Sequence, residues 1–272
     1  MRCFFLIAIL LAIPLTAGAG APVVRVAAIG GINDLNFWSA LSIRFEQSTG
    51  IHIDTVATGN KDAIPALFQK GGIDLLTMQS SDVILSLVAN GYAADPQPWM
   101  QTDLAIIGPA TDPAHIKGMT DASAAVKKIL HSQSPFVIHA SSGADQIVRA
   151  ILQGSKADLD SKNITVLLDD HQKRVLQVAV DKKAYTLIAR IPYLSGKIKA
   201  DGFSLMVTGD PILRRPLLLA IANPQKLPGV HLLEAQRLAT FLFSEETQKW
   251  IAQFGKSKFD DQPFYFSLQP PH

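Results

Sequence analysis

Short apolar runs and helical spacings alternate along the chain from residue 23 onward. The segments VVRVAAIG (23–30), IHIDTVAT (51–58) and IDLLTM (73–78) are short and apolar, which is typical of buried strands. Between the first two, residues 33–50 place Leu35, Trp38, Leu41 and Phe45 on one helical face and end at Gly50. Helical spacings return in 63–72 and 81–91. This alternation predicts an α/β fold in which helices cover both faces of a mostly parallel sheet.

A second set of strands and helices follows the proline-rich stretch ADPQPW (94–99), after which the strand DLAIIGPATDP (103–113) is predicted to begin. The set continues through SPFVIHASSGADQIVRAILQG (134–154), VLQVAVDKKAYTLIARIPYL (175–194) and FSLMVTG (203–209). A further strand, RRPLLLAIANP (214–224), and two helices at 234–244 and 245–255 end the pattern. We interpret residues 22–103 and 214–272 as lobe 1 and residues 104–213 as lobe 2. Two chain crossings then join the lobes, with a ligand cleft between them.

The beginning of the chain has the three parts of a secretory signal peptide. Arg2 is followed by the apolar run CFFLIAILLAIPL (3–15) and by the small residues TAGAGA (16–21), which suit cleavage after Ala19 or Ala21. A membrane anchor is the disfavoured alternative, because a spanning helix needs about 20 apolar residues. Residues 1–19 are therefore predicted to be a signal peptide, and the mature protein to be periplasmic. Cys3 is the only cysteine, so the mature chain has no disulfide.

Charge and histidine placement exclude some classes of partner. The chain has 25 Lys and Arg against 23 Asp and Glu without a basic cluster, which argues against nucleic acid as the main partner. Its seven histidines are scattered, with no pair at the spacings that bind a metal ion. We therefore predict no protein-bound metal and no cofactor.

The turns after the strands are the candidate ligand contacts. In open parallel sheets a ligand binds beyond the carboxyl ends of the strands. Here those turns are residues 28–33, 58–62 and 79–82, which are small, polar and almost free of charge. The candidate ligand-binding residues in them are Gly30, Gly31, Thr58 and Ser80.

The turn between the strand and the helix in FVIHASSGADQIVRAIL (136–152) has three interpretations. Ser141, Ser142 and Gly143 resemble the start of a phosphate cradle at a helix N-terminus. They also suit a simple helix cap, which stays open. A nucleophilic serine is disfavoured, because the Gly-x-Ser-x-Gly elbow is absent and Asp145 would repel an oxyanion. We predict a site for an anion or a small polar ligand, and no enzyme.

Five segments resemble one family. DLAIIGPATDPAHIKG (103–118), SPFVIHASSGADQ (134–146), KKAYTLIAR (182–190), TGDPILRRPLLLAIANP (208–224) and FGKSKFDDQPFYF (254–266) follow the order found in periplasmic tungstate-binding proteins. These are related to the molybdate and sulfate binders and deliver oxyanions to ABC importers. The resemblance implies a two-lobed type II solute-binding fold. It also implies a ligand held by hydroxyls, backbone amides and an arginine.

The chain differs from this family at the ligand site. The turn after the first strand is rich in threonine and serine in the family, whereas 28–31 here is Ala-Ile-Gly-Gly, which offers backbone N–H groups only. His139 stands where the family has its ligand-binding arginine, and Ala144 replaces a threonine. A histidine is mostly neutral at pH 7 and gains charge as the pH falls. If His139 lines the cleft, anion binding should strengthen on acidification.

Three further arginines and one tyrosine complete the candidates. Arg190 matches a family arginine that follows Tyr-Thr-Leu, and a salt bridge, for example with Asp181, is the alternative. Arg214 and Arg215 precede the returning strand and could reach the cleft or a partner, but a solvated pair is the favoured interpretation. Tyr185 is predicted to pack in the protein wall.

Two hypotheses on function follow. The first is a monomeric periplasmic binding protein that captures a tungstate- or molybdate-like anion, or a related polar solute, and delivers it to an ABC permease. The second is a related protein that has lost oxyanion binding and serves as a sensor or accessory domain.

Overall fold

The computed structural model describes residues 21–59, 61–79, 82–139, 145–156, 161–168, 172–258 and 263–268. Its strands are β1 (Val23–Ala28), β2 (His52–Ala57), β3 (Leu75–Gln79), β4 (Ala93–Pro109), β5 (Phe136–His139), β6 (Ile164–Leu167), β7 (Tyr185–Ala189), β8 (Phe203–Val207), β9 (Arg214–Ala222) and β10 (Phe266–Ser267). Its α-helices are α1 (Phe37–Thr49), α2 (Ile64–Gln69), α3 (Asp82–Ala89), α4 (Ala122–His131), α5 (Asp145–Ser155), α6 (Gln172–Asp181), α7 (Arg190–Leu194), α8 (Leu232–Phe243) and α9 (Glu245–Gln253). Strands and helices alternate as the sequence pattern predicts, so the α/β class is confirmed.

One half of the molecule is built on the strand order β2-β1-β3-β9-β4. β1 pairs parallel with β2 and β3, and β9 runs antiparallel to β3 and β4. Helices α1, α8 and α9 pack on one face, where Val24 and Leu217 meet Phe45 and Leu238. Helices α2 and α3 cover the other face. The central strands β1 and β3 are therefore largely buried on both sides, which explains their mostly apolar sequences, whereas the edge strand β2 is mostly exposed.

The other half is built on β4, β7, β5 and β6. β5 pairs parallel with β6 and β7, whereas β4 runs antiparallel to β7 and β8. Helices α4 and α5 pack on the face that contains Phe136 and Ile138. Helix α6 packs on the opposite face against Val137.

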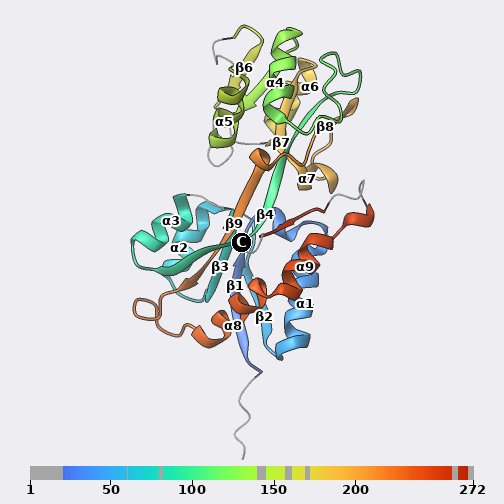
Figure 1. Ribbon diagram of the computed structural model, residues 1–272. Coiled ribbons are helices and arrows are strands. Elements are labelled where there is room, and N and C mark those ends of the chain that lie inside the picture. Colours follow the sequence, from blue (N-terminus) through green and yellow to red (C-terminus); the bar gives the residue numbers. More distant parts are fainter. Residues whose placement is uncertain are drawn as a thin grey trace, which may run out of the picture.

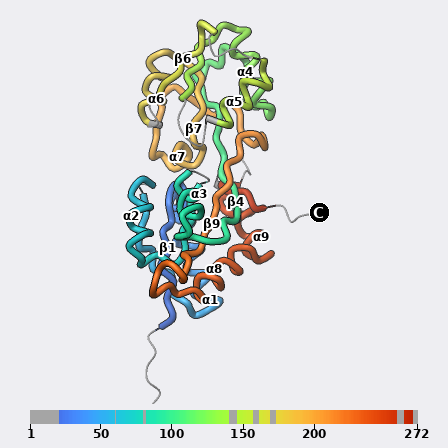
Figure 2. Tube along the Cα trace, turned by 90° about the vertical axis from the view of Figure 1, so that its left-hand side faces the viewer, coloured from blue at the N-terminus to red at the C-terminus, as the bar shows by residue number. Residues whose placement is uncertain are grey.

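Strands β4 and β9 pass between the two halves. In two views at right angles, the elements from α4 to β8 lie on one side of this passage, and β1–β3 with α1–α3, α8 and α9 lie on the other (Figures 1 and 2). β4 is hydrogen-bonded to β9 in the first half and to β7 and β8 in the second. The lobe boundaries at residues 103 and 213 stay a prediction.

The start of β4 differs from the sequence prediction. The sequence pattern predicts a proline-rich break at 94–99 and a strand that begins at residue 103, whereas β4 begins at Ala93. The pairing with β9 shifts register between Ala94 and Gln97 and again between Pro98 and Met100. A proline has no N–H for a sheet ladder and is tolerated where the ladder is irregular. The strand therefore continues through both prolines.

A close contact fixes the packing of β4 on β7. A Cβ added to Gly108 would lie 2.2 Å from the Tyr185 ring, so only glycine allows this approach. The Tyr185 hydroxyl donates to Asp112 Oδ1 (2.8 Å) and accepts from the Ala114 N–H (2.9 Å). Tyr185 is fully buried, as the sequence analysis predicted for a packing residue.

Candidate functional site

The carboxyl ends of the two sets of parallel strands face each other. Gln79, the last residue of β3, pairs with Leu217, and β9 extends beyond it through Pro216 to Arg214 toward the second half. Ala189, the last residue of β7, pairs with Leu104 of β4, which directly follows the residues of β4 that pair with β9. Each set therefore ends at the passage between the halves. Turns at such ends are where open α/β sheets bind ligands.

The turns of the first half bring some of the predicted residues to one edge. β1 lies between β2 and β3, with Ala27 opposite both Ala57 and Leu76. Gly30 has a φ of 93°, a conformation that favours glycine, and it is exposed, as is Thr58. Gly31 is half-buried at the start of the short helix η1 (Gly31–Asn36). Ser80 lies outside the described residues.

The Gly30 turn is held by side chains. Asn33 Nδ2 donates to the Ala28 carbonyl (2.6 Å), and the Tyr265 hydroxyl donates to the Gly31 carbonyl (2.9 Å). The side chain of Asp34 is buried and forms an ion pair with Lys197, which follows α7. Helix α7 of the second half also contacts η1 of the first. This contact ties the two halves together on one side of the passage.

In the second half, the structure describes only the residues on either side of the turn between β5 and α5. His139 ends β5 and is buried, with 5% of its surface exposed. Ser141, Ser142 and Gly143 lie outside the described residues, so their predicted roles stay predictions. The His139 role also stays a prediction.

Arg190 is the first residue of α7, and its buried side chain forms several hydrogen bonds within the protein. Its Nε donates to both Asp103 carboxylate oxygens (2.7 and 2.8 Å), and its Nη2 donates to the carbonyls of Pro263 (2.7 Å) and Phe264 (3.2 Å). Burial raises the pKa of Asp103 to about 6, while the Arg190 and Arg214 charges oppose this rise. The salt-bridge alternative for Arg190 is thus realised with Asp103, so the suggested partner Asp181 was wrong. A ligand role for Arg190 stays untested.

The interpretation of Arg214 and Arg215 as a solvated pair was wrong. Both are half-buried at the start of β9. The Arg214 guanidinium lies 4.6 Å from the centre of the Phe266 ring, and its Nε is buried without a hydrogen-bond partner among the residues that the structure describes. Burial lowers the pKa of Arg215 to about 10. The alternative that the two arginines reach the cleft or a partner fits their position at the crossing, before the returning strand, and stays a prediction.

Two features bear on other classes of site. Over the part of the chain that the structure describes, no three His, Cys, Asp or Glu side chains are grouped so as to hold a metal ion. Within the same residues, no helix is long and apolar enough to cross a bilayer.

Comparisons with known proteins agree on one class. The model of the bacterial extracellular solute-binding proteins matches residues 24–256. A tungstate-binding protein of Peptoclostridium acidaminophilum is 27% identical over 79% of this chain and 75% of its own length. A Haloferax volcanii protein named as an ABC transporter anion-binding protein is 25% identical over 81% of this chain and 66% of its own length.

A solved structure supports the same assignment. The tungstate-binding protein from Desulfovibrio alaskensis superposes with a TM-score of 0.72 at 25% identity, covering 92% of this chain and all of that one. The predicted resemblance to tungstate-binding proteins and the two-lobed α/β fold are therefore confirmed. The relatives are named as binding proteins and not as enzymes.

Proposed function

The chain belongs to the bacterial extracellular solute-binding proteins, and from this premise we propose that it binds a small oxyanion of the tungstate or molybdate class between its two lobes. The observation that supports this proposal best is that the carboxyl ends of β3 and β7 face each other across the passage formed by β4 and β9. The relatives named as tungstate- and anion-binding proteins support the ligand class.

The proposed ligand contacts are backbone amides and hydroxyls. In this proposal Gly30, Gly31 and Thr58 contact the anion from the first lobe, together with Ser80. Ser141, Ser142 and Gly143, which precede α5 in the sequence, contact it from the second lobe. Helix N-termini favour negative charge, by about 0.3–1 kcal/mol at exposed sites. Such a site holds its ligand by binding alone, and we propose no catalysis.

The export and delivery steps complete the proposal. Residues 1–19 act as a cleaved signal peptide, and the mature monomer works in the periplasm. The loaded protein then docks on the permease of an ABC importer. This partner is supported by the name of the Haloferax volcanii relative.

Calorimetry on the mature protein tests the ligand class. We expect saturable binding of tungstate or molybdate with a Kd at or below about 1 µM, which corresponds to about −8 kcal/mol. Sulfate and chloride, titrated under the same conditions, control for ligand size and for general anion effects. If none of the oxyanions produces binding heat or raises the Tm, the proposal is wrong, and a sensor or accessory role becomes the better one.

Acidification tests the role of His139. If His139 lines the cleft, the same titration at pH 5.5 should give tighter binding than at pH 8, by up to the roughly 1.5–3 kcal/mol of a charged hydrogen bond. The His139→Gln variant should lose this pH dependence while keeping its fold. Equal affinities at both pH values in the unchanged protein would assign His139 to packing only.

A further inference from the structure

Arg215 lies at the crossing between the lobes, close to the end of β3. Gln79 ends β3 opposite Leu217, so Arg215 stands two residues beyond that end along β9. On its other side Arg215 pairs with Thr102 of β4. The residue therefore sits on the wall between the two facing sets of strand ends.

A polar cluster identifies the face to which Arg215 belongs. Directly opposed residues of antiparallel strands project to the same face of a sheet, so Arg215 shares its face with Thr102. β9 lies between β3 and β4, yet Gln79 Nε2 donates to Thr102 Oγ1 (3.1 Å). The Gln79 side chain therefore crosses β9 beside Arg215. Asp103 and Arg214 are the next opposed pair and take the opposite face, where Phe266 lies.

Arg190 and Arg215, two arginines at the crossing, differ in their hydrogen-bond partners. Arg190 makes four hydrogen bonds, two of them to the Asp103 carboxylate. Arg215 is half-buried and makes no hydrogen bond or ion pair within the described part of the chain. A guanidinium carries five N–H donors, and removing a charge from water without an acceptor is costly. The protein itself supplies no described acceptor to offset that cost.

The proposed oxyanion is negatively charged and accepts hydrogen bonds, so it would supply the acceptors that the Arg215 guanidinium lacks. The proposed contacts from the described turns of the first lobe, Gly30, Gly31 and Thr58, carry no charge. A planar guanidinium can hold two oxygens of an anion at once. We propose that Arg215 is the positively charged residue that binds the oxyanion, reaching it from the crossing strand β9. This inference rests on the proposed function.

The test compares Arg215→Gln and Arg215→Lys with a matched control, Arg237→Gln, which removes an exposed arginine from α8. The measurements are calorimetric titration with tungstate and molybdate and the Tm of each ligand-free variant. We expect Arg215→Gln to weaken binding by roughly 10- to 100-fold, the range of a charged hydrogen bond. Arg215→Lys should weaken it by about tenfold, because an ammonium keeps the charge without the planar fork. Arg237→Gln should bind as the unchanged protein does.

The ligand-free Tm separates binding from a structural role. If Arg215 binds the ligand and has no hydrogen-bond partner in the described protein, the Arg215→Gln variant should keep or raise the Tm. The reason is that the substitution removes a half-buried charge that no protein group offsets. If the unchanged protein binds the oxyanion and both Arg215 variants bind equally well, the inference is wrong while the proposed function stands. Lower affinity together with a clearly lower ligand-free Tm would make Arg215 a structural residue. If the unchanged protein binds no oxyanion, both proposals fall together.

Discussion

Replacing Arg190 by methionine is expected to lower the free energy of unfolding by about 3–5 kcal/mol near pH 8, the usual cost of breaking a buried ion pair. Both members of this pair are almost fully buried, with side-chain exposures of 2% for Arg190 and 1% for Asp103. Methionine keeps an unbranched apolar side chain, but it is shorter than arginine and donates nothing to Asp103 or to the carbonyls of Pro263 and Phe264. Urea unfolding of the ligand-free protein measures the loss.

The loss should grow with pH. Burial already raises the pKa of Asp103 to about 6, above its unfolded value of about 3.9, so the folded protein disfavours the ionised form. Removing Arg190 removes a charge that opposes this rise, and the folded pKa should go higher still. A raised folded pKa gives stability that is complete below the unfolded pKa and is lost as the pH rises through the folded value. The variant should therefore lose less stability at pH 5 than at pH 8.

A double variant separates the ion pair from simple packing. Asp103→Leu combined with Arg190→Met replaces the pair by apolar side chains and leaves no buried charge. We expect it to recover at least half of the lost stability. If the single Arg190→Met variant unfolds like the unchanged protein but no longer binds oxyanion, Arg190 is a ligand residue, as the family resemblance implies, and the structural assignment is wrong.

Local pattern predicted the elements of this fold well, for a physical reason. Strands buried on both faces must be apolar, and helices that cover them must be apolar on one side, so both leave a period in the sequence. The pattern failed at the start of β4, where Pro96 and Pro98 fit at irregular points of the ladder. Such points depend on the partner strand β9, which lies more than a hundred residues further along the chain.

The candidate site was less predictable from the sequence, because its charged side chains pair with residues that lie far away along the chain. Arg190 finds Asp103 at a separation of 87 residues, whereas the sequence suggested a nearer carboxylate, Asp181. For Arg215 the sequence favoured a solvated surface charge over a position in the cleft, whereas the strand order places it at the crossing between the two halves. The turns after strands could be named from sequence, because parallel strands fix where their ends lie. Which charged side chain reaches such a turn is decided by tertiary packing.

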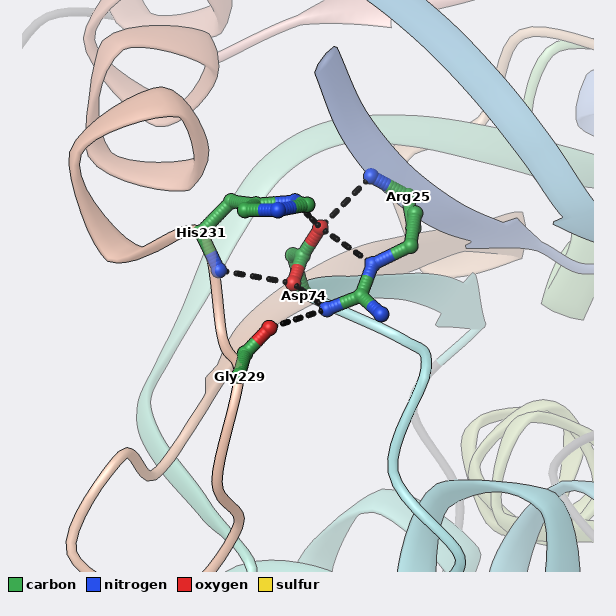
Figure 3. A network of polar contacts seen from close by, with 4 residues as sticks. All are labelled: Arg25, Asp74, Gly229 and His231. Carbon is green, nitrogen blue, oxygen red and sulfur yellow. Dashed lines mark hydrogen bonds and ion pairs between the residues drawn. The ribbon is translucent and has the colours of Figure 1, made fainter. Parts of the chain in front are cut away.

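Replacing Asp74 by asparagine is expected to cost about 3–5 kcal/mol of stability at pH 7, the range found when a buried ion pair loses one member. Asp74 is fully buried just before β3 and accepts from the backbone N–H (2.7 Å), Nε (3.0 Å) and Nη2 (2.5 Å) of Arg25. It also accepts from the backbone N–H (2.9 Å) and Nδ1 (3.1 Å) of His231, as Figure 3 shows. Arg25 in turn donates to the Gly229 carbonyl (2.6 Å). One carboxylate therefore joins β1, the start of β3 and the segment before α8.

The pH dependence of this loss has the opposite sign to that at Asp103. Burial works to raise the pKa of Asp74, but the hydrogen bonds from Arg25 and His231 outweigh it and hold the pKa below its usual value. A depressed folded pKa gives stability that is present above the unfolded value of about 3.9 and is lost as the pH falls through the folded value. The gap between the unchanged protein and Asp74→Asn should thus be complete at pH 7 and should narrow toward pH 3.

Asp54→Asn is the matched control, because Asp54 is exposed on β2 opposite Arg25 and should change stability by no more than about 0.5 kcal/mol. The Asp74 network lies at the amino ends of the strands, away from the turns proposed to hold the oxyanion. Folded Asp74→Asn should therefore bind tungstate as tightly as the unchanged protein, whereas Arg215→Gln should lose affinity and keep its stability. Urea midpoints and calorimetry on the same samples compare the two variants. A stability loss at Asp74 below about 1 kcal/mol would show that its hydrogen bonds only offset the cost of burying the carboxylate.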